Sequence, residues 1–344
     1  MPSATAARSA SPSPIEDEAA PMIPLLRLLA LAPLAALALL LRPGEAQAQS
    51  CSATPADLTF GVIDTLSTTS QDQTTQVRVN CTGTRNRTVW VCLHIGDGSG
   101  GSSSSLTPRY LRSGTNTLSF DLYTDPGRTN IWGSAVFPGQ NPRGPLVDTI
   151  ALDGNGAGSK TFTMYGRVFG GQPTTPLGTY SSSFGGNHTI MYYSYLANCA
   201  GGANRTPGFP FNVTAQVNAK CLVGGSNVLD FGSHGLLGTA FDAQAPIDMR
   251  CTPGTPYSIA LGAGTGPGAT ITNRRMKLGS ETILYQLYTN AGRTNVWGDG
   301  VTGSTVGGTG TGNAPNLTVY GRVPAQPTPS AGAYGDAVVI TVNY

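Results

Sequence analysis

Six cysteines are the residues of this 344-residue chain whose type and spacing point most directly to a chemical role, the disulfide bond. Cys51 and Cys81 are 30 positions apart (81 − 51), and Cys221 and Cys251 have the same separation (251 − 221). Two equal spacings of this kind are typical of secreted domains that each carry one disulfide bond. On the chain-entropy estimate, a closed loop of this length stabilises its domain by roughly 3.6 kcal/mol.

The remaining cysteines, Cys92 and Cys199, both lie in or beside the first half of the chain. We expect them to pair with each other, and the alternative is a free or rearranged pair. A zinc site is disfavoured, because the sequence contains no Cys-x-x-Cys pair and its three histidines are scattered. We therefore expect no metal and no cofactor.

The histidines also give no support to catalysis. A nucleophile needs a base within hydrogen-bond reach and a third group that orients the base. His94, His188 and His234 do not occupy matching places in the two halves of the chain, and no motif frames a serine or a cysteine. The Gly-rich stretch GDGSGGSSSS at residues 96–105 lacks the lysine and the following helix of a phosphate-binding loop. The sequence predicts a protein that is not an enzyme.

The N-terminal residues 1–48 differ from the rest of the chain and predict a secretory signal peptide. Residues 23–41 form an apolar run, and AQAQ at residues 46–49 is typical of a small-residue cleavage site. The alternative is a membrane anchor, since the run is barely long enough to span a bilayer. Three acidic residues precede the run and do not suit a leader, so Met22 is a second candidate for the start.

The composition of the remaining chain predicts an all-β protein. Cleavage after Ala48 would leave 344 − 48 = 296 residues, enough for two domains with their own cores. The formal net charge is only +2 and no basic stripe is present, so we expect no nucleic-acid partner. Gly and Pro interrupt every stretch, and the regular segments alternate with period two and favour Val, Thr, Tyr and Phe.

An internal repeat organises the two domains. LYTDPGRTNIWG at residues 122–133 returns as LYTNAGRTNVWG at residues 287–298, an offset of 287 − 122 = 165. FTMYGRV at residues 162–168 likewise returns as LTVYGRV at residues 317–323. Repetition at a fixed offset indicates two copies of one structural unit.

The repeated Arg and Trp side chains have two interpretations. Arg128 and Trp132 recur as Arg293 and Trp297, and such residues could form a ligand site. Their presence in both copies favours a shared framework, with Arg bonding backbone carbonyls and Trp in or beside the core. The tyrosines of the two YGRV motifs are interpreted in the same way, as strand residues.

Residues 209–219, FPFNVTAQVNA, form the longest alternating stretch and lie between the two repeat units. Successive side chains of a strand point to opposite faces, so one face of this strand would be apolar. The residues of that face are Phe209, Phe211, Val213, Ala215, Val217 and Ala219. The alternation does not decide whether the strand belongs to the first domain, to the second domain or to another molecule.

The order of the motifs resembles a known family, the spore coat protein U domain. The resemblance is carried by an early Cys followed by x-Phe-Gly, a second Cys, LYxxxxRTNxWG, YGRV and a closing PxxGxYxDxVxITVxY. These motifs cover nearly the whole mature chain, twice. PSAGAYGDAVVITVNY at residues 329–344 matches the family ending throughout, whereas the first unit has Ser182 where the second has Asp336.

The resemblance implies a fold and a set of partners. Such domains are similar to subunits of archaic chaperone-usher pili, which are incomplete immunoglobulin-like β-sandwiches. A periplasmic chaperone and then the next subunit fill the missing strand's groove by β-strand addition. The implied partners are this chaperone, an outer-membrane usher and a neighbouring subunit, and the implied location is the cell surface. The C-terminal strand is the implied chaperone contact, with alternating residues Val338, Ile340, Val342 and Tyr344.

The position of residues 209–219 predicts a place in the fibre. Pilins of this type carry a donor strand ahead of the first Cys, but only two residues separate the expected cleavage site from Cys51. We therefore expect residues 209–219 to complete a first domain, 49–219, and to leave a second domain, 220–344, open to a strand from the next subunit. A subunit that accepts a strand without donating one would stand at the tip. The alternative is that 209–219 is the first strand of the second domain.

A long loop in the first copy predicts an adhesive surface. Between the WG and YGRV motifs the first copy is ten residues longer than the second (162 − 132 = 30 against 317 − 297 = 20). The apolar residues of the loop are Val136, Phe137, Leu146 and Val147. Because exposed apolar loop residues can mark a contact site, we expect adhesion to an abiotic or host surface here, and a role in biofilm formation, with Phe169 and residues 110–111 extending the surface. The equal alternative is that Phe137 folds back onto the sandwich.

The alternative function is a free-standing secreted or coat β-sandwich protein that binds its ligand without entering a fibre. Solubility without a partner and indifference to donor peptides would favour this alternative. Dependence on a co-expressed chaperone would favour the pilus subunit.

Overall fold

The computed structural model describes residues 48–137, 143–199, 203–225 and 227–344. The expected signal peptide and the second start candidate, Met22, therefore lie outside the described residues, apart from Ala48. In the described ranges, no helix has the length and apolarity needed to cross a membrane. Helix is represented there by two single turns, η2 (Gly186–His188) and η3 (Ala197–Cys199).

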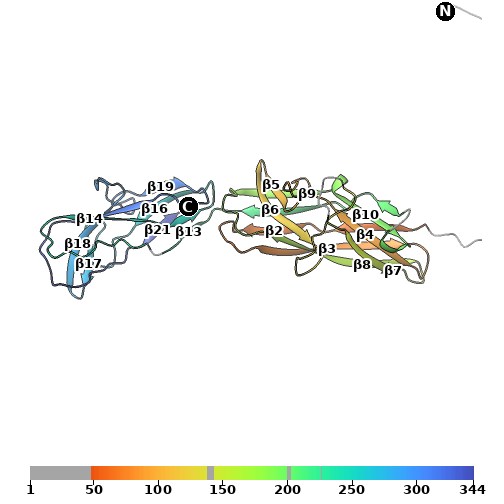
Figure 1. Ribbon diagram of the computed structural model, residues 1–344, viewed down its shortest axis with the longest axis horizontal. Helices are drawn as coiled ribbons and strands as arrows, with labels where there is room; N and C mark the ends of the chain where they lie inside the picture. The colour runs from red at the N-terminus through yellow and green to blue at the C-terminus, as the bar shows by residue number, and fades with distance from the viewer. Residues whose placement is uncertain (1–47, 138–142, 200–202, 226) are drawn as a thin grey trace, which may run out of the picture. The chain divides into compact units, whose positions relative to one another are not determined.

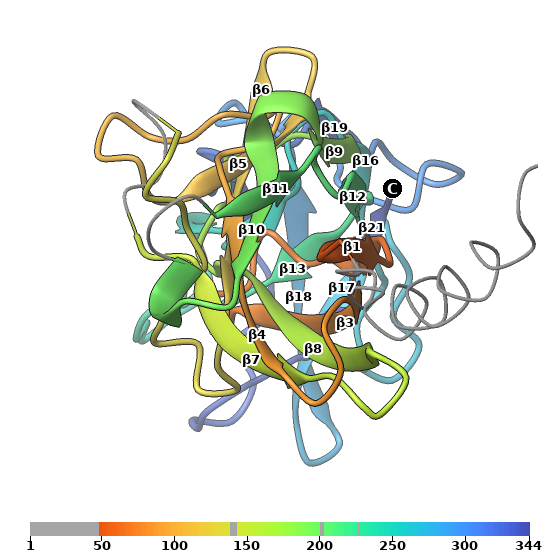
Figure 2. The same ribbon diagram turned by 90° about the vertical axis from the view of Figure 1, so that its right-hand side faces the viewer.

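Within the described residues, the first domain contains twelve strands. They are β1 (Ser50–Pro55), β2 (Leu58–Ile63), β3 (Gln71–Thr82), β4 (Thr88–Ile95), β5 (Arg109–Ser113), β6 (Asn116–Tyr123), β7 (Leu146–Ala151), β8 (Ala157–Val168), β9 (Gly178–Phe184), β10 (Thr189–Ser194), β11 (Asn204–Thr206) and β12 (Phe211–Val217). One sheet has the order β1-β3-β8-β6-β5-β9-β12-β2, and the other has the order β11-β10-β4-β7 (Figures 1 and 2). The two sheets enclose one apolar core, as in a β-sandwich.

The second domain repeats this plan with strands that are mostly shorter. They are β13 (Cys221–Val223), β14 (Phe241–Pro246), β15 (Met249–Cys251), β16 (Pro256–Leu261), β17 (Arg274–Leu278), β18 (Glu281–Tyr288), β19 (Val306–Thr309), β20 (Thr318–Val323) and β21 (Ile340–Asn343). The sheets have the orders β14-β20-β18-β17, β19-β16-β21 and β13-β15. Its core is separate from that of the first domain.

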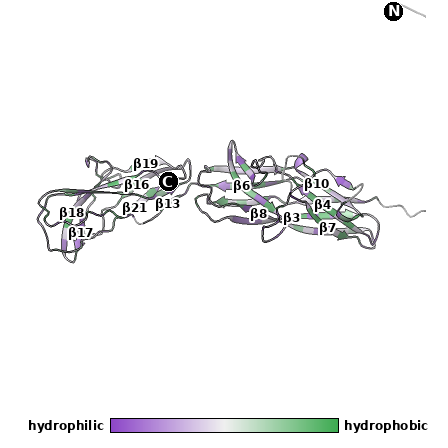
Figure 3. Cartoon of the chain, in the orientation of Figure 1, coloured by the Kyte–Doolittle hydropathy of each residue, from purple (hydrophilic) through white to green (hydrophobic). Residues whose placement is uncertain are grey.

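Alternation along the strands explains why each sheet has an apolar face. Hydrophobic and hydrophilic residues follow one another along the strands, as the green and purple patches of Figure 3 show. In β3, Val77, Val79 and Cys81 are buried, while Arg78 and Asn80 between them are exposed. β3 pairs with β8 over its whole length in an antiparallel register, so both strands direct alternate side chains into the core. The predicted all-β class with two tandem sandwiches is confirmed.

Candidate functional site: an open groove in the second domain

The second domain contains a groove that opens into its apolar core. Its cavity volume is about 360 Å³. The residues that line it include apolar side chains from the two larger sheets, among them Leu261, Met276, Leu287 and Val319. Two further segments, residues 227–231 and 334–338, border the groove without forming strands. Most of the residues that line this cavity are apolar by type, so it is suited to take up apolar side chains.

The segments of the first domain that match residues 334–338 and 227–231 are in β9 and at the start of β2, and a strand lies between these two strands. β12 pairs in antiparallel register with β9, from Phe211 opposite Phe184 to Val217 opposite Gly178. On its other side, β12 pairs in parallel register with β2. Both neighbours of β12, β9 and β2, belong to the first domain.

The side chains of one face of this strand are buried in the first core. They are Phe209, Phe211, Val213, Ala215 and Val217. The ring of Phe211 stacks on that of Phe184, with 4.6 Å between the ring centroids. The sixth residue of the expected face, Ala219, lies beyond the end of β12 and is exposed. The alternation in the sequence thus continues past the point where the strand ends.

The second domain has the matching segments but no strand between them in the described residues. Its counterpart of β9 is residues 332–338, held to β17 by one isolated bridge between Lys277 and Gly335. The inward side chains of that segment, Tyr334, Asp336 and Val338, are only half-buried. Their counterparts in β9 are Tyr180, Ser182 and Phe184, each at most 1% exposed. The side chains of the second domain are less buried because no neighbouring strand covers them in the described residues.

The counterpart of β2 differs in the same way. Leu58 and Phe60 of β2 are buried in the first core. Leu229 and Phe231, which occupy the matching places in the second domain, are half-buried beside the groove. A Cβ added to Gly166 would lie 2.5 Å from Leu58, and one added to Gly321 would lie 2.4 Å from Leu229. Each YGRV glycine therefore leaves the space that this segment needs.

A carboxylate and a phenol lie together in the groove wall. The hydroxyl of Tyr285 donates a hydrogen bond of 2.6 Å to Oδ2 of Asp336. Burial, together with the hydrogen bond and charge of Asp336, raises the pKa of the Tyr285 hydroxyl well above its usual range. The phenol therefore stays protonated and donates at any physiological pH.

The repeated Arg and Trp residues form the predicted framework. Nε of Arg128 donates to the carbonyl of Gly166 at 3.2 Å, and Nε of Arg293 donates to the carbonyl of Gly321 at 3.0 Å. Trp132 and Trp297 are fully buried, and each indole donates to a backbone carbonyl. The interpretation of these motifs as structural is confirmed.

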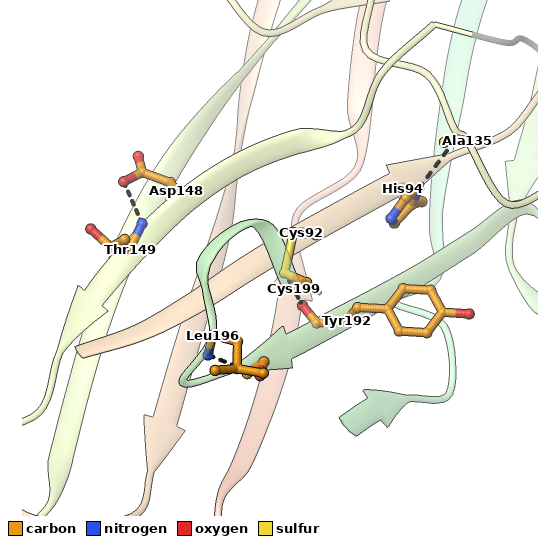
Figure 4. The surroundings of a disulfide bond; sticks show 9 residues. Cys92, His94, Ala135, Asp148, Thr149, Tyr192, Leu196 and Cys199 are labelled. Carbon is orange, nitrogen blue, oxygen red and sulfur yellow. Dashed lines mark hydrogen bonds between the residues drawn. A yellow bond between two sulfur atoms is a disulfide. The ribbon is translucent and has the colours of Figure 1, made fainter. Parts of the chain in front are cut away.

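The structure contains all three expected disulfide bonds, Cys51–Cys81, Cys92–Cys199 and Cys221–Cys251. The first and third are equivalent, because each joins the first strand of a domain to its partner strand. Cys92–Cys199 has no counterpart and ties η3 to the outer face of β4, beside His94 and Tyr192 (Figure 4).

Comparison with known proteins identifies the family. The family model of the Spore Coat Protein U domain matches residues 37–186 and again residues 208–341. The chain belongs to the spore coat protein U domain family. Protein U of Myxococcus xanthus is a curated relative, 31% identical over an alignment of 148 residues that covers 39% of this chain and 82% of that protein. The second match begins at residue 208, so it includes β12, although β12 pairs with the first domain.

Two solved structures are similar to this chain at low sequence identity. One is the chaperone–tip adhesion subunit complex CsuC-CsuE of the archaic Csu pili of Acinetobacter baumannii, at 16% identity, with 86% of this chain and 100% of that chain covered and a TM-score of 0.49. Another is the CupB6 tip adhesin of Pseudomonas aeruginosa, at 13% identity, with coverage of 85% and 93% and a TM-score of 0.35. The family to which the chain belongs is one of structural proteins rather than enzymes.

The expected adhesive loop is partly described. Val136 and Val147 are 39% and 42% exposed. Leu146 packs against the first core, and Phe137 is half-buried beside Ile190 of β10. Residues 138–142 of this loop lie outside the described residues.

The expected extension of the adhesive surface is wrong in one position. Leu111 is fully buried in the core, because it is an inward residue of β5. Tyr110, its neighbour in the strand, is half-buried, as is Phe169.

The expected chaperone-contact residues lie in and before the last strand. β21 pairs with β16 on one side and forms an edge of its sheet within the described residues. Ile340 and Val342 are half-buried against the second core, and Val338 lines the groove. Tyr344 is exposed.

Sequence reasoning missed a pair of buried arginines in this framework. Nη1 of Arg109 forms a 2.7 Å ion pair with Asp121, and its Nη2 donates to the carbonyl of the framework tryptophan. Arg274 takes the same place in the second domain, with Gln286 in place of the aspartate. The offset of 165 (274 − 109) relates the two arginines and could have revealed them. Within the described residues, no group of three His, Cys, Asp or Glu residues is placed to hold a metal ion.

Proposed function

We propose that this protein is a subunit of a chaperone-usher pilus that is exported through the periplasm to the cell surface. The observation that carries the proposal is the contrast between the two domains. The first domain holds a strand of its own chain, β12, between β9 and β2. The matching place in the second domain is an open apolar groove. The occupant that fits this groove is a β-strand of another subunit, with apolar side chains at every second position as in β12.

The proposal includes a position at the pilus tip. The segment that precedes the second repeat unit, where a donor strand would be expected, is already used within the chain as β12. The subunit then receives a strand in its second domain and gives none from residues 209–219. Such a subunit ends a fibre rather than continuing it.

The open groove also supports a chaperone partner before assembly. Half-buried apolar residues such as Phe231 and Val338 would otherwise meet water, and such surfaces promote aggregation. The free edge of β21 is a second place where a chaperone strand can pair. The usher then exchanges the chaperone for the neighbouring subunit. In this proposal, Val136 and Val147 contribute to attachment to an abiotic or host surface and to biofilm formation.

The proposal is tested by giving the second domain a strand of its own. A copy of residues 209–219 is fused after Tyr344 through twelve Gly and Ser residues, a linker with a root-mean-square reach of about 19 Å. The graft should raise the thermal stability of the second domain and keep the protein monomeric without a chaperone. The matched control is a graft with aspartate at the positions of Val213 and Val217, which should have no such effect.

Two outcomes would contradict the proposal. One is an unchanged second domain in the grafted protein, and the other is equal stabilisation by the two grafts. An ungrafted chain that is soluble and monomeric and does not respond to donor peptides would instead favour a free-standing binding protein.

A further inference from the structure

The edge segment beside the groove, residues 330–338, is held mainly by two carboxylates. Oδ1 of Asp336 accepts hydrogen bonds from the amide and hydroxyl of Thr265, at 2.7 and 2.9 Å, and Oδ2 accepts the hydroxyl of Tyr285 at 2.6 Å. Oε2 of Glu281 accepts the hydroxyl of Tyr334 at 3.0 Å and the amide of Ser330 at 3.2 Å. Side-chain bonds therefore fix most of the segment, and its backbone pairs with β17 only through the two hydrogen bonds between Lys277 and Gly335.

The first domain does not use this device. The residue that matches Asp336 is Ser182, and the residue that matches Tyr285 is Phe120, which has no hydroxyl (285 − 165 = 120). β9 is instead paired with β12 along its whole length. The carboxylate–phenol bond thus occurs in the domain where the neighbouring strand is missing and is absent where that strand is present.

The bonds of Asp336 join three separate parts of the second domain. Thr265 lies in the loop after β16, Tyr285 lies in β18, and Asp336 lies in the edge segment. A hydrogen bond to a charged group contributes about 1.5–3 kcal/mol, and ordering one residue costs about 1–2 kcal/mol. Three such bonds are therefore enough to hold a few residues in place, whereas the single bridge between Lys277 and Gly335 is not.

We propose that Asp336, Tyr285 and Thr265 form a latch that holds residues 334–338 in the conformation that accepts an incoming strand. This inference rests on the proposed function of the groove. Asp336 acts as a positioning residue, because it orders one side of the groove before the strand arrives. Once a strand is inserted, its ladder takes over this task, as β12 does for β9. The latch therefore affects the rate of strand uptake more than the stability of the filled domain.

The kinetic test uses the full chain and a labelled peptide with the sequence of residues 209–219. The variants Asp336→Ser and Tyr285→Phe introduce the residues of the first domain. If loss of the latch leaves one tenth of the molecules ready for uptake, the association rate constant falls about tenfold for Asp336→Ser. Tyr285→Phe removes one of the three bonds, and we expect a fall of about threefold. The dissociation rate constant should stay within about twofold for both variants.

The matched control is Asp248→Ser, which removes an exposed carboxylate of the same domain outside the groove lining and should leave both rate constants unchanged. A dissociation rate that rises as much as the association rate falls would overturn the proposal, because it would assign Asp336 a merely structural role. So would association rates equal to that of the unmodified chain. Tyr285→Phe keeps the test decisive if Asp336→Ser does not fold.

A second measurement separates this inference from the proposed function. Hydrogen–deuterium exchange is measured on the chain without peptide, and residues 334–338 should exchange about tenfold faster in Asp336→Ser than in the unmodified protein. Unchanged exchange would overturn the latch whether or not the peptide binds. Failure of the unmodified chain to bind the peptide, with faster exchange in the variant, would instead contradict the proposed function.

Discussion

The two domains of this chain share one framework and differ in the state of one strand position. Both have the buried arginine, the tryptophan that donates to a carbonyl and the glycine that makes room for a Leu-x-Phe segment. In the part of the chain that the structure describes, only the first has a strand, β12, in the place between its β9 and β2. The comparison shows that this framework forms with the strand position either filled or open. Whether the strand position of a domain is filled is therefore independent of the framework and depends on which segment occupies the groove.

A second difference lies on the outer face of the smaller sheet. In the first domain, one row across this face consists of Val147, Cys92 and Tyr192. The matching row of the second domain consists of Gly307, Ser258 and Asn343. The apolar row and its disulfide bond are thus additions to the common framework. They are found in the domain that is already complete.

The largest effect is expected from removing the strand that makes the domains differ. Replacing residues 209–218 with a Gly/Ser linker of equal length removes five buried apolar side chains, each contributing about 1.5–3 kcal/mol. Ala215 is smaller and contributes less. The contributions of the other four side chains together approach the whole free energy of unfolding of an ordinary domain, so the first domain should unfold. Differential scanning calorimetry should show one transition fewer, with that of the second domain unchanged. Adding the peptide 209–219 should restore the lost transition, and a first domain that unfolds as before would contradict the role given to β12.

The disulfide bond that is found only in the first domain should have the next largest effect. Cys92 and Cys199 close a loop of 107 residues, for which the chain-entropy estimate gives about 4.7 kcal/mol. Replacing both with Ser should lower the free energy of unfolding of the first domain by about 4 kcal/mol, measured by urea titration. The matched control replaces Cys221 and Cys251 and should destabilise the second domain instead. Equal destabilisation of both domains by either pair would show that the two domains unfold together.

Much of the framework could be predicted from the sequence, because it follows from local patterns. The period of two predicts strands, and the offset of 165 and the equal cysteine spacings predict two similar domains with matching disulfide bonds. The burial of Trp132 and Trp297 follows from their recurrence in both copies. These features depend on residues close in sequence or related by one fixed offset.

The features that could not be predicted depend on contacts between distant residues. Alternation gives the apolar face of β12 but not its neighbours, and it placed Ala219 on that face although the strand ends at Val217. Leu111 was expected to extend the exposed adhesive surface, yet β5 directs it into the core. The latch joins Asp336 to residues 71 and 51 positions away, and no local pattern relates them.

The stability of the two domains should also depend differently on pH. His94 in the first domain is buried, and burial lowers its pKa from 6.5 to about 4, whereas the matching residue of the second domain is Ala260. The unfolded chain binds a proton at His94 as the pH falls below about 6.5, but the folded domain does not until about pH 4. The stability of the first domain should therefore be constant above pH 6.5 and fall by about 3 kcal/mol towards pH 4.

The check is the free energy of unfolding of each domain between pH 7 and pH 4. His94→Gln should remove most of the slope of the first domain. The carboxylates Asp72 and Asp242, whose pKa values are lowered mainly by hydrogen bonds from Arg167 and Arg322, contribute to the two domains alike and act at lower pH. A slope of the first domain that persists in His94→Gln would mean that another group carries it.

The smallest effects are expected at the exposed apolar residues of the first domain. Val136 and Val147 retain about two fifths of their exposure, so covering each on a surface contributes at most about 1 kcal/mol, or roughly a fivefold change in affinity. Replacing both with Ser should weaken attachment of the purified protein to polystyrene and leave the free energy of unfolding within about 0.5 kcal/mol. Val301, 94% exposed in the corresponding loop of the second domain, provides the control. Because the proposed attachment surface belongs to the first domain, Val301→Ser should leave attachment unchanged. Equal losses for the two domains would mean that attachment depends on general hydrophobicity, and the apolar row would then not distinguish the first domain from the second.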